Sequence, residues 1–248
     1  MAEALAYVGH DLESMSLARN YRRWILDLFA PHLGRRVVEV GAGTGSFSEL
    51  LLAREPESLT LVEPSAEMHR LLVEHVGRLP TRARVRVYND TFARVAGRLT
   101  EGGERPDSII YVNVLEHVED DEAELRLVAD ALAPGGRAFI FVPAFRWLYG
   151  SFDRQVGHRR RYTRGELAAK CGRAGFRVVK SAYFDAAGVL PWWLKYRVLR
   201  SEKMEPAAVK FYDDFCVPVV RRVEAVVPPP LGKNVLLVAE KPRAGEKF

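Results

Sequence analysis

Short β-branched runs alternate along the chain with stretches in which apolar residues recur every three or four positions. Short apolar runs are typical of buried parallel strands, and the wider spacing is typical of amphipathic helices. The predicted strands are Arg36 to Val40, Leu59 to Val62, Val85 to Tyr88, Ser108 to Val112, Ala138 to Val142, Arg177 to Phe184 and Asn234 to Ala239. The predicted helices are Leu17 to Phe29, Ser46 to Ala53, Ala66 to Val76 and Asp121 to Ala133. The alternation predicts a doubly wound α/β sheet.

One long stretch interrupts this alternation. Residues 185–233 separate the sixth and seventh predicted strands and are too many for an ordinary loop. The stretch is rich in aromatic residues and carries several lysines and arginines. We therefore expect an inserted cap with helices of its own.

A strand runs directly into a glycine-rich turn early in the chain. The segment Val37-Val38-Glu39-Val40-Gly41-Ala42-Gly43-Thr44-Gly45 is followed by a predicted helix from Ser46. Glycine lets the chain turn sharply and brings bare backbone against a ligand, because a Cβ there would occupy the ligand's volume. Ser46 stands where the dinucleotide fingerprint has its last glycine. The turn therefore predicts a ligand site and disfavours a nicotinamide dinucleotide as the ligand.

Polar residues also follow the second and third predicted strands. Glu63 comes about 20 residues after the glycine turn, where a carboxylate can accept hydrogen bonds from both hydroxyls of a ribose. Asp90 and Thr91 follow the third strand, beside the aromatic Phe92. Acidic residues at helix starts and plain N-caps have the same appearance in a sequence.

Composition narrows the class of protein. Hydrophobic residues make up 48% and charged residues 28%, which excludes disordered, collagenous and coiled-coil classes. The two cysteines, Cys171 and Cys216, lack metal-binding spacing, so neither a disulfide framework nor a thiolate zinc site is expected. The sequence shows no signal-peptide pattern and no apolar stretch near the roughly 18 residues of a membrane span. We therefore expect a cytoplasmic protein.

Positive charge is concentrated in one part of the chain. Residues 145–203 hold 14 Lys and Arg against 4 Asp and Glu, although the whole chain carries a net charge of only +5. Such a region can attract an anionic substrate, a nucleic acid or an acidic lipid surface. A solvated surface that keeps the protein soluble has the same composition.

Taken together, the motifs resemble those of the class I S-adenosylmethionine-dependent methyltransferases. The resemblance rests on Glu39 to Gly45, on Glu63, on Asn113-Val114-Leu115-Glu116-His117-Val118 and on Leu132-Ala133-Pro134-Gly135-Gly136. Within that superfamily the chain is most similar to the small-molecule group that includes the ubiquinone and menaquinone biosynthesis methyltransferases. The likeness covers about residues 20–184 and the last strand. It implies a Rossmann-like, mostly parallel sheet of seven strands whose last strand is antiparallel.

The resemblance also implies S-adenosylmethionine as the cofactor and suggests how the chain is divided. The cofactor-binding residues that it implies are Glu39, Gly41, Ala42, Gly43, Thr44, Gly45, Glu63, Asp90, Thr91 and Asn113, with Tyr21 and His10 on a segment that folds over the cofactor. The expected units are an N-terminal helical lid segment (1–34), a cofactor-binding Rossmann-like domain (35–184), the inserted cap (185–233), and the last strand with a disordered tail (234–248). Helix packing is the alternative role for Tyr21 and His10.

Methyl transfer from a sulfonium is an in-line displacement, so the main task of the protein is alignment. A hydroxyl or protonated amine acceptor also needs a base, and His158 and His117 are the two candidates. His117 could instead be a helix-start residue bonded to backbone. A guanidinium can hold an anionic acceptor and aromatic rings can cover it. The expected substrate-binding residues are Arg161, Tyr162, Tyr183, Trp192 and Trp193, with core packing as the alternative for the tryptophans.

Two further classes are disfavoured. The fourth strand ends in Asn113-Val114-Leu115-Glu116, without the Asn-Pro-Pro-aromatic group with which related enzymes hold a flipped base, so no nucleic acid is expected. The fifth strand ends in Val142-Pro143-Ala144, which offers no hard oxygen ligands, so no metal is expected. We predict methyl transfer to a small anionic or aromatic acceptor. The alternatives are a nicotinamide-dependent oxidoreductase and a non-enzymatic membrane-surface module built on residues 192–203.

Overall fold

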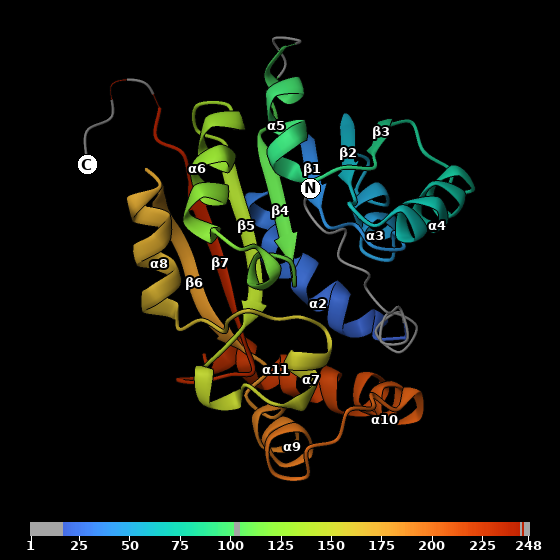
Figure 1. The fold of residues 1–248 in the computed structure, drawn as a ribbon, viewed down its shortest axis with the longest axis vertical. Coiled ribbons are helices and arrows are strands. Elements are labelled where there is room, and N and C mark those ends of the chain that lie inside the picture. The colour runs from blue at the N-terminus through green and yellow to red at the C-terminus, as the bar shows by residue number, and fades with distance from the viewer. Residues whose placement is uncertain (1–16, 102–104, 244, 246–248) are drawn as a thin grey trace.

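The computed structural model describes residues 17–101, 105–243 and 245, and these form one seven-stranded sheet with helices on both faces (Figure 1). The strands are β1 (Arg36–Val40), β2 (Ser58–Val62), β3 (Arg84–Tyr88), β4 (Ser108–Val112), β5 (Arg137–Pro143), β6 (Arg177–Phe184) and β7 (Asn234–Glu240). Their order across the sheet is β3-β2-β1-β4-β5-β7-β6. Strands β1 to β5 are parallel, whereas β7 runs antiparallel to both β5 and β6. The predicted fold class is confirmed.

Helices fill the connections between the strands. The α-helices are α2 (Arg19–Phe29), α3 (Ser48–Leu52), α4 (Ala66–Gly77), α5 (Phe92–Glu101), α6 (Asp121–Ala131), α7 (Ser151–Gln155), α8 (Arg164–Arg173), α9 (Val189–Trp192), α10 (Pro206–Phe211) and α11 (Val217–Val226). The short 3₁₀ segments are η1 (Ala30–His32), η2 (Leu115–His117) and η3 (Arg146–Leu148), and the π-helical segments are η4 (Trp193–Val198) and η5 (Tyr212–Cys216). The sequence analysis did not predict α5, α7 and α8. Among the described residues, no helix is both long and apolar enough to cross a bilayer.

The sheet is covered by a different set of helices on each face. Helices α5, α6 and α8 pack on one face through Val95, Leu125 and Leu167. Helices α2, α3 and α4 pack on the other face through side chains that include Phe29 and Leu72. Because both faces are covered, the central strands are mostly apolar, which is why they appear in the sequence as short apolar runs.

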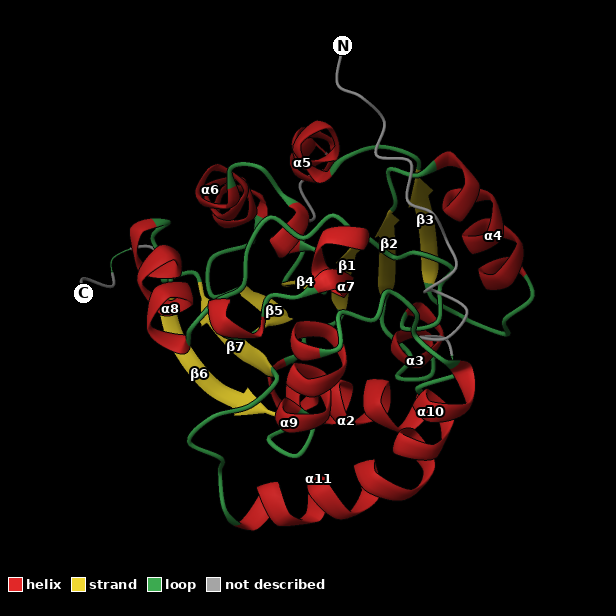
Figure 2. Ribbon diagram, turned by 60° about the horizontal axis from the view of Figure 1, so that its bottom comes forward, coloured by secondary structure: helices red, strands yellow, loops and turns green. Residues whose placement is uncertain are grey.

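The inserted segment leaves and rejoins the sheet at one point. The Lys233 backbone N–H donates to the Asp185 carbonyl at 3.0 Å, and Lys233 Nζ lies 2.9 Å from Asp185 Oδ2. The Tyr212 hydroxyl donates to the same buried carboxylate. Burial alone would raise the pKa of Asp185, but the Lys233 charge holds it below its usual range. Figures 1 and 2 show α9, α10 and α11 gathered beyond the carboxyl ends of β4 and β5.

A carboxylate of this insertion caps the first described helix. Asp213 is buried, and its two oxygens accept hydrogen bonds from the backbone N–H groups of Asn20 at 2.9 Å and Tyr21 at 2.8 Å. These amides belong to the first turn of α2, where helical N–H groups have no partner within the helix. Asp213 therefore fixes the insertion to α2 by N-capping from a distant part of the sequence.

Replacing Asp213 with alanine is expected to lower the free energy of unfolding by about 1–2 kcal/mol, because an N-cap and its favourable interaction with the helix dipole are lost. Urea unfolding of the Asp213→Ala variant, with an unchanged slope, measures this loss. The neighbouring Asp214 is the matched control, since it makes only an exposed ion pair with Lys210 at 2.7 Å. Asp214→Ala should change stability by less than about 0.5 kcal/mol. Equal effects of the two variants would contradict the capping role.

Candidate active site

The glycine turn after β1 has the backbone shape that its sequence predicts. Gly41, Gly43 and Gly45 all have positive φ, of 68°, 55° and 87°, a conformation that residues with a Cβ seldom adopt. A Cβ built on Gly41 would come within 2.4 Å of a methyl group of Val114, and one on Gly45 within 2.9 Å of Leu72. Packing therefore requires two of these glycines, while Gly43 stands at the middle of the turn.

Glu63 links this turn to the end of β2. Its Oε2 accepts from the Gly43 backbone N–H at 2.8 Å, and its Oε1 accepts from the Ser65 backbone N–H at 2.9 Å. The residue is buried, and burial raises the pKa of its carboxyl although the two backbone hydrogen bonds oppose the shift. Each carboxylate oxygen has a second lone pair, so Glu63 can still accept from ligand hydroxyls.

Glu39 is a second buried acid beside the turn. It lies on β1, and its Oε2 accepts a hydrogen bond from the Ser48 hydroxyl at 2.5 Å. Burial raises the pKa of Glu39 to about 8, with a further contribution from the Glu63 charge and an opposing one from the Ser48 hydrogen bond. Glu39 is therefore mostly protonated at neutral pH, and a bound cation would favour its charged form.

The next two strands bring the other predicted polar residues to the same sheet edge. Asn113 follows β4 with φ of 55°, and its backbone N–H donates to the Phe141 carbonyl of β5 at 2.8 Å. Asp90 follows β3, and its Oδ1 accepts from the Thr91 backbone N–H at 2.9 Å. The parallel pairing of β3, β2, β1 and β4 places these groups beside the glycine turn.

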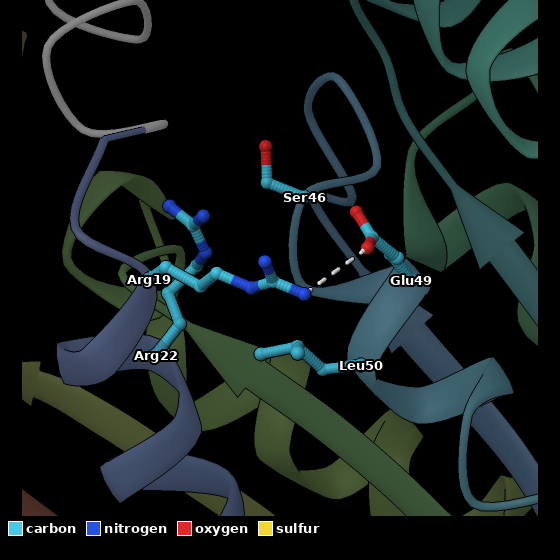
Figure 3. Close-up of a pocket in the computed structure, with 5 residues that line it drawn as sticks. All are labelled: Arg19, Arg22, Ser46, Glu49 and Leu50. Carbon is cyan, nitrogen blue, oxygen red and sulfur yellow. Dashed lines mark ion pairs between the residues drawn. The ribbon is translucent and has the colours of Figure 1, made fainter.

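A small pocket of about 200 Å³ adjoins the turn on its α2 side (Figure 3). It is lined by Arg19, Arg22, Ser46, Glu49 and Leu50. Arg19 lies 4.0 Å from Glu49, and Figure 3 shows both arginines pointing from α2 towards Ser46. These two cations were not predicted from the sequence, because they precede the turn by 22 and 19 residues.

A second cluster lies where β4 and β5 end. The His158 Nδ1 is 2.7 Å from Asp153 Oδ1, and its Nε2 is 3.7 Å from Glu116 Oε1. The ring of His117 meets that of His158 edge-on, with centroids 4.8 Å apart. The structure therefore brings the two predicted histidines together and adds two acids, Asp153 and Glu116, to which the sequence analysis gave no role.

Burial tunes these groups differently. Burial raises the pKa of Glu116 to about 7, although His158 and Arg161 oppose the shift, and neither carboxyl oxygen has a hydrogen-bond partner among the described residues. Burial lowers the pKa of His117 to about 4, so that this imidazole is neutral at neutral pH. Burial alone would raise the pKa of Asp153, but the His158 hydrogen bond and the Arg161 charge hold it below its usual range.

The ionised Asp153 fixes the orientation of His158. A carboxylate can only accept, so Nδ1 carries the hydrogen that faces Asp153, and in the neutral imidazole Nε2 on the Glu116 side then has the lone pair. Arg161 in turn fixes Asp153, donating to its two oxygens at 2.8 Å and 3.0 Å. An imidazole held in one tautomer by a buried carboxylate is the arrangement of a general base.

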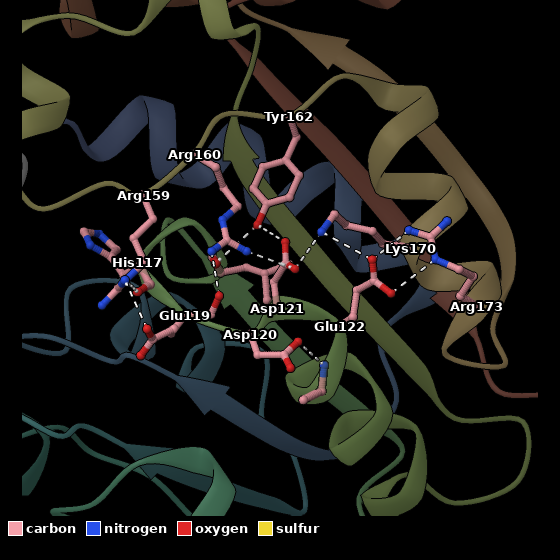
Figure 4. A network of polar contacts seen from close by, with 12 residues as sticks. His117, Glu119, Asp120, Asp121, Glu122, Arg159, Arg160, Tyr162, Lys170 and Arg173 are labelled. Atoms are coloured by element: carbon pink, nitrogen blue, oxygen red, sulfur yellow. Dashed lines mark hydrogen bonds and ion pairs between the residues drawn. The ribbon is translucent and has the colours of Figure 1, made fainter. Parts of the chain in front are cut away.

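An arginine-rich cleft of about 670 Å³ opens beside this cluster. Its lining residues are Arg146, Tyr149, Arg159, Arg160, Arg161, Tyr162, Glu166, Lys170 and Arg197. Inside the cleft, Asp121 Oδ1 lies 3.0 Å from Arg160 and 2.6 Å from Lys170, a network seen in Figure 4. Arg146, at the rim of the cleft, is less engaged than these residues, because its side chain is 81% exposed and makes only a 3.6 Å pair with Glu166. The rim can therefore bind an anion from solution.

The predicted substrate-binding residues separate into two groups. Arg161 and Tyr162 line the cleft, but both are buried and already engaged, Arg161 with Asp153 and Tyr162 through its hydroxyl with Asp121 at 2.8 Å. The other three lie outside the residues that line this cleft. Trp192 packs on the Arg161 guanidinium at 5.1 Å, Tyr183 stacks on Phe145, and Trp193 is 38% exposed.

The N-terminal residues with an expected lid role have a different placement. Tyr21 is buried, its hydroxyl donates to Asn234 Oδ1 at 3.0 Å, and its ring packs against Phe141 and Phe184. These are the contacts of a packing residue between α2 and the sheet. His10 lies outside the described residues.

The fold is that of a class I methyltransferase. The chain matches the family model described as a methyltransferase domain over residues 12–181, and it belongs to that family. It is 32% identical over 146 residues to an uncharacterized methyltransferase of Exiguobacterium sibiricum, covering 51% of this chain and 67% of the relative. It is 33% identical over 111 residues to a ubiquinone biosynthesis O-methyltransferase of Rhizobium etli, covering 44% of this chain and 42% of that relative.

The solved structures agree on the fold. A SAM dependent methyltransferase from Archaeoglobus fulgidus superposes with a TM-score of 0.60 at 18% identity, covering 90% of this chain and 94% of that chain. The N-methyltransferase NodS from Bradyrhizobium japonicum, solved in complex with S-adenosyl-L-homocysteine, gives 0.56 at 14% identity, covering 91% and 87%. The prediction of a class I S-adenosylmethionine-dependent methyltransferase is thus confirmed by family and fold.

Proposed function

We propose that this chain transfers the methyl group of S-adenosylmethionine to a small anionic acceptor, and that His158 is the base. One observation carries the proposal: the glycine turn with Glu63 and the Asp153–His158–Glu116 cluster lie at the same edge of the sheet, at the ends of neighbouring parallel strands. A donor site and a base at one edge are the two parts that methyl transfer to a protonated acceptor requires.

The described residues fit the proposed cofactor. Glu63 has acceptor capacity for a ribose diol, and the positive-φ glycine turn lies beside it. Arg19 and Arg22 line a pocket with Ser46 and can pair with the carboxylate of the methionine part of S-adenosylmethionine. Glu39 provides a carboxyl for the positive charge of the same molecule. When bound, S-adenosylmethionine supplies an electrophilic methyl group on a sulfonium.

The acceptor side of the proposal rests on charge. Arg146, Arg159 and Arg197 line the cleft next to the base. The Arg159 guanidinium donates to the His117 carbonyl at 3.1 Å, so one residue that lines the cleft also contacts the backbone of the histidine pair. A guanidinium recognises carboxylate or phosphate groups through paired hydrogen bonds. In this arrangement the rim arginines hold the anion, while His158 Nε2 takes the proton as the acceptor atom attacks.

Calorimetric titration with S-adenosylmethionine and S-adenosylhomocysteine tests the cofactor assignment. Both are expected to bind with one site per chain, and NADH is expected not to bind. Binding of NADH alone would favour the oxidoreductase alternative and overturn the proposal.

A cytoplasmic location stays part of the proposal, supported by two free cysteines, one of which is buried.

The Glu63→Ala variant is expected to bind S-adenosylmethionine about 10- to 100-fold more weakly, because hydrogen bonds to a charged group contribute about 1.5–3 kcal/mol. Glu57→Ala is the matched control, since Glu57 lies just before β2 at the other end and makes only an exposed pair with Arg84. The dissociation constants of both variants are measured by the same titration. An unchanged constant for Glu63→Ala would show that Glu63 serves the turn and not the ligand.

A further inference from the structure

The insertion displays most of the large apolar side chains that the protein leaves in solvent. Of the seventeen exposed large hydrophobic residues in the described part of the chain, twelve lie between Leu190 and Leu231. Monomeric proteins rarely leave apolar side chains gathered on one surface without a binding role. The distribution of these residues along the helices shows how they are arranged.

One apolar stripe follows the helix that runs through α10, η5 and α11. Phe211, Phe215, Val219 and Val223 are spaced four residues apart and are 61%, 65%, 57% and 58% exposed. Residues spaced by four share one face of a helix. Val217, on the same helix, is 1% exposed and packs into the protein core. The helix therefore has apolar residues on its solvent-facing side as well as on the side that packs on the core.

A second stripe follows α9 and η4. Leu190, Leu194 and Val198 are also spaced by four, and they are 67%, 47% and 47% exposed. Trp193 lies beside them and is 38% exposed, whereas Tyr196 on the opposite side is buried. Figure 2 shows α9, α10 and α11 together at one end of the molecule, away from α5 and α6.

The charge around the two stripes is basic. Lys195, Arg200, Lys203 and Arg222 make no ion pair with any described residue. Most acids of the insertion are engaged elsewhere: Asp213 caps α2, Asp214 pairs with Lys210, and Glu224 accepts from the Asp185 and Ala186 backbone N–H groups. Of the acids in this segment, Glu202 and Glu205 are the two left without such a partner. A second copy of the chain would bring the same positive charges into contact, whereas anionic lipid headgroups would neutralise them.

We propose that the two stripes form a docking surface for an anionic lipid bilayer. The apolar side chains of α9–η4 and α10–η5–α11 enter the boundary between headgroups and acyl chains, and the four basic side chains contact the headgroups. This combination of apolar residues that include Trp and Phe with Lys and Arg defines helices that lie in a membrane interface. The proposal is independent of the acceptor and goes beyond the proposed function.

Co-sedimentation of the full chain with vesicles tests this surface. The protein is expected to sediment with vesicles of phosphatidylcholine and phosphatidylglycerol, to remain in solution with pure phosphatidylcholine, and to be released from the anionic vesicles by high salt. Failure to bind anionic vesicles at low salt, or equal binding to neutral ones, would overturn the proposal.

Matched variants locate the contact. Val219→Ser with Val223→Ser is expected to weaken vesicle binding about tenfold, because two partly inserted valines lose their burial. Val73→Ser with Val179→Ser is the control, since these valines are also exposed but lie on α4 and β6. Circular dichroism and the S-adenosylmethionine titration should be unchanged in both variants. A dimer in sedimentation equilibrium that Val219→Ser with Val223→Ser dissociates would assign the stripe to a second copy and overturn the lipid proposal.

Discussion

Replacing Gly43 with valine is expected to weaken S-adenosylmethionine binding by about a hundredfold or more while the protein stays folded. Gly43 has φ of 55°, where a β-branched residue is strained by about 1–3 kcal/mol. Its backbone N–H is also the group that holds Glu63 Oε2 at 2.8 Å. The branched side chain and the displaced Gly43 N–H would both disturb the surface of the turn that meets the ligand. A loss of about 2.7 kcal/mol of binding free energy corresponds to a hundredfold higher dissociation constant.

Gly175→Val separates strain from obstruction. Gly175 follows α8 with φ of 88°, and a Cβ built on it meets nothing within 4 Å. This control should lose a similar amount of stability in urea unfolding but keep its affinity for S-adenosylmethionine in calorimetry. If Gly43→Val also kept that affinity, the turn would not be the cofactor site.

Replacing His158 with alanine is expected to lower the rate of methyl transfer by about 10²- to 10⁴-fold, the usual contribution of a positioned base. Cofactor affinity should be unchanged, because His158 follows β5 and does not contact the glycine turn. The Asp153 carboxylate keeps its two bonds from Arg161 in this variant, so folding should survive. Labelled methyl incorporation into an acceptor identified by metabolite screening measures the rate.

His117→Ala divides the two candidate bases. Burial lowers the pKa of His117 to about 4, which makes its imidazole a weak proton acceptor. We therefore expect a loss below about tenfold for this variant. His32→Ala is the control variant and should leave the rate unchanged. His32 lies on η1, where its carbonyl accepts a hydrogen bond from Arg137 at the amino end of β5, the end opposite to the site. Full turnover in both His158→Ala and His117→Ala would favour alignment without a base.

The central strands could be predicted because strands buried on both faces are apolar runs in the sequence, whereas the edge strands β3 and β6 are more exposed and were found by their β-branched residues. All seven predicted strands are present, with ends that differ by one residue at most. Of the three helices that were not predicted, two had clear signals in the sequence. Helix α5 buries Phe92, Val95 and Ala96 at helical spacing, and α8 begins with the Thr163–Glu166 capping box. Helix α3 starts at Ser48, two residues later than predicted, because Ser46 and Phe47 remain in the turn.

The site was predictable only where it follows the strands in order. The glycine turn and Glu63 lie at the ends of β1 and β2, so the topology alone brings them together. The pairing of His158 with Glu116 joins loops 42 residues apart, and no local pattern reports it. Arg161 is predicted to hold substrate, whereas in the structure its guanidinium donates hydrogen bonds to Asp153. Spacing in a sequence does not reveal which side chain of a loop points inward.

The hydrogen bond and ion pair between Asp185 and Lys233 bear on how the inserted segment can vary in length and sequence. Since both ends of the inserted segment meet at one closed clasp, its interior can grow, shrink or be exchanged without moving β6 or β7. A replacement segment would also have to supply the contacts that Asp213 makes with α2 and that Trp192 makes with Arg161. The glycine turn and Glu63 at the ends of β1 and β2 would be inherited unchanged, while the cleft, to which the segment contributes Arg197, would vary with it.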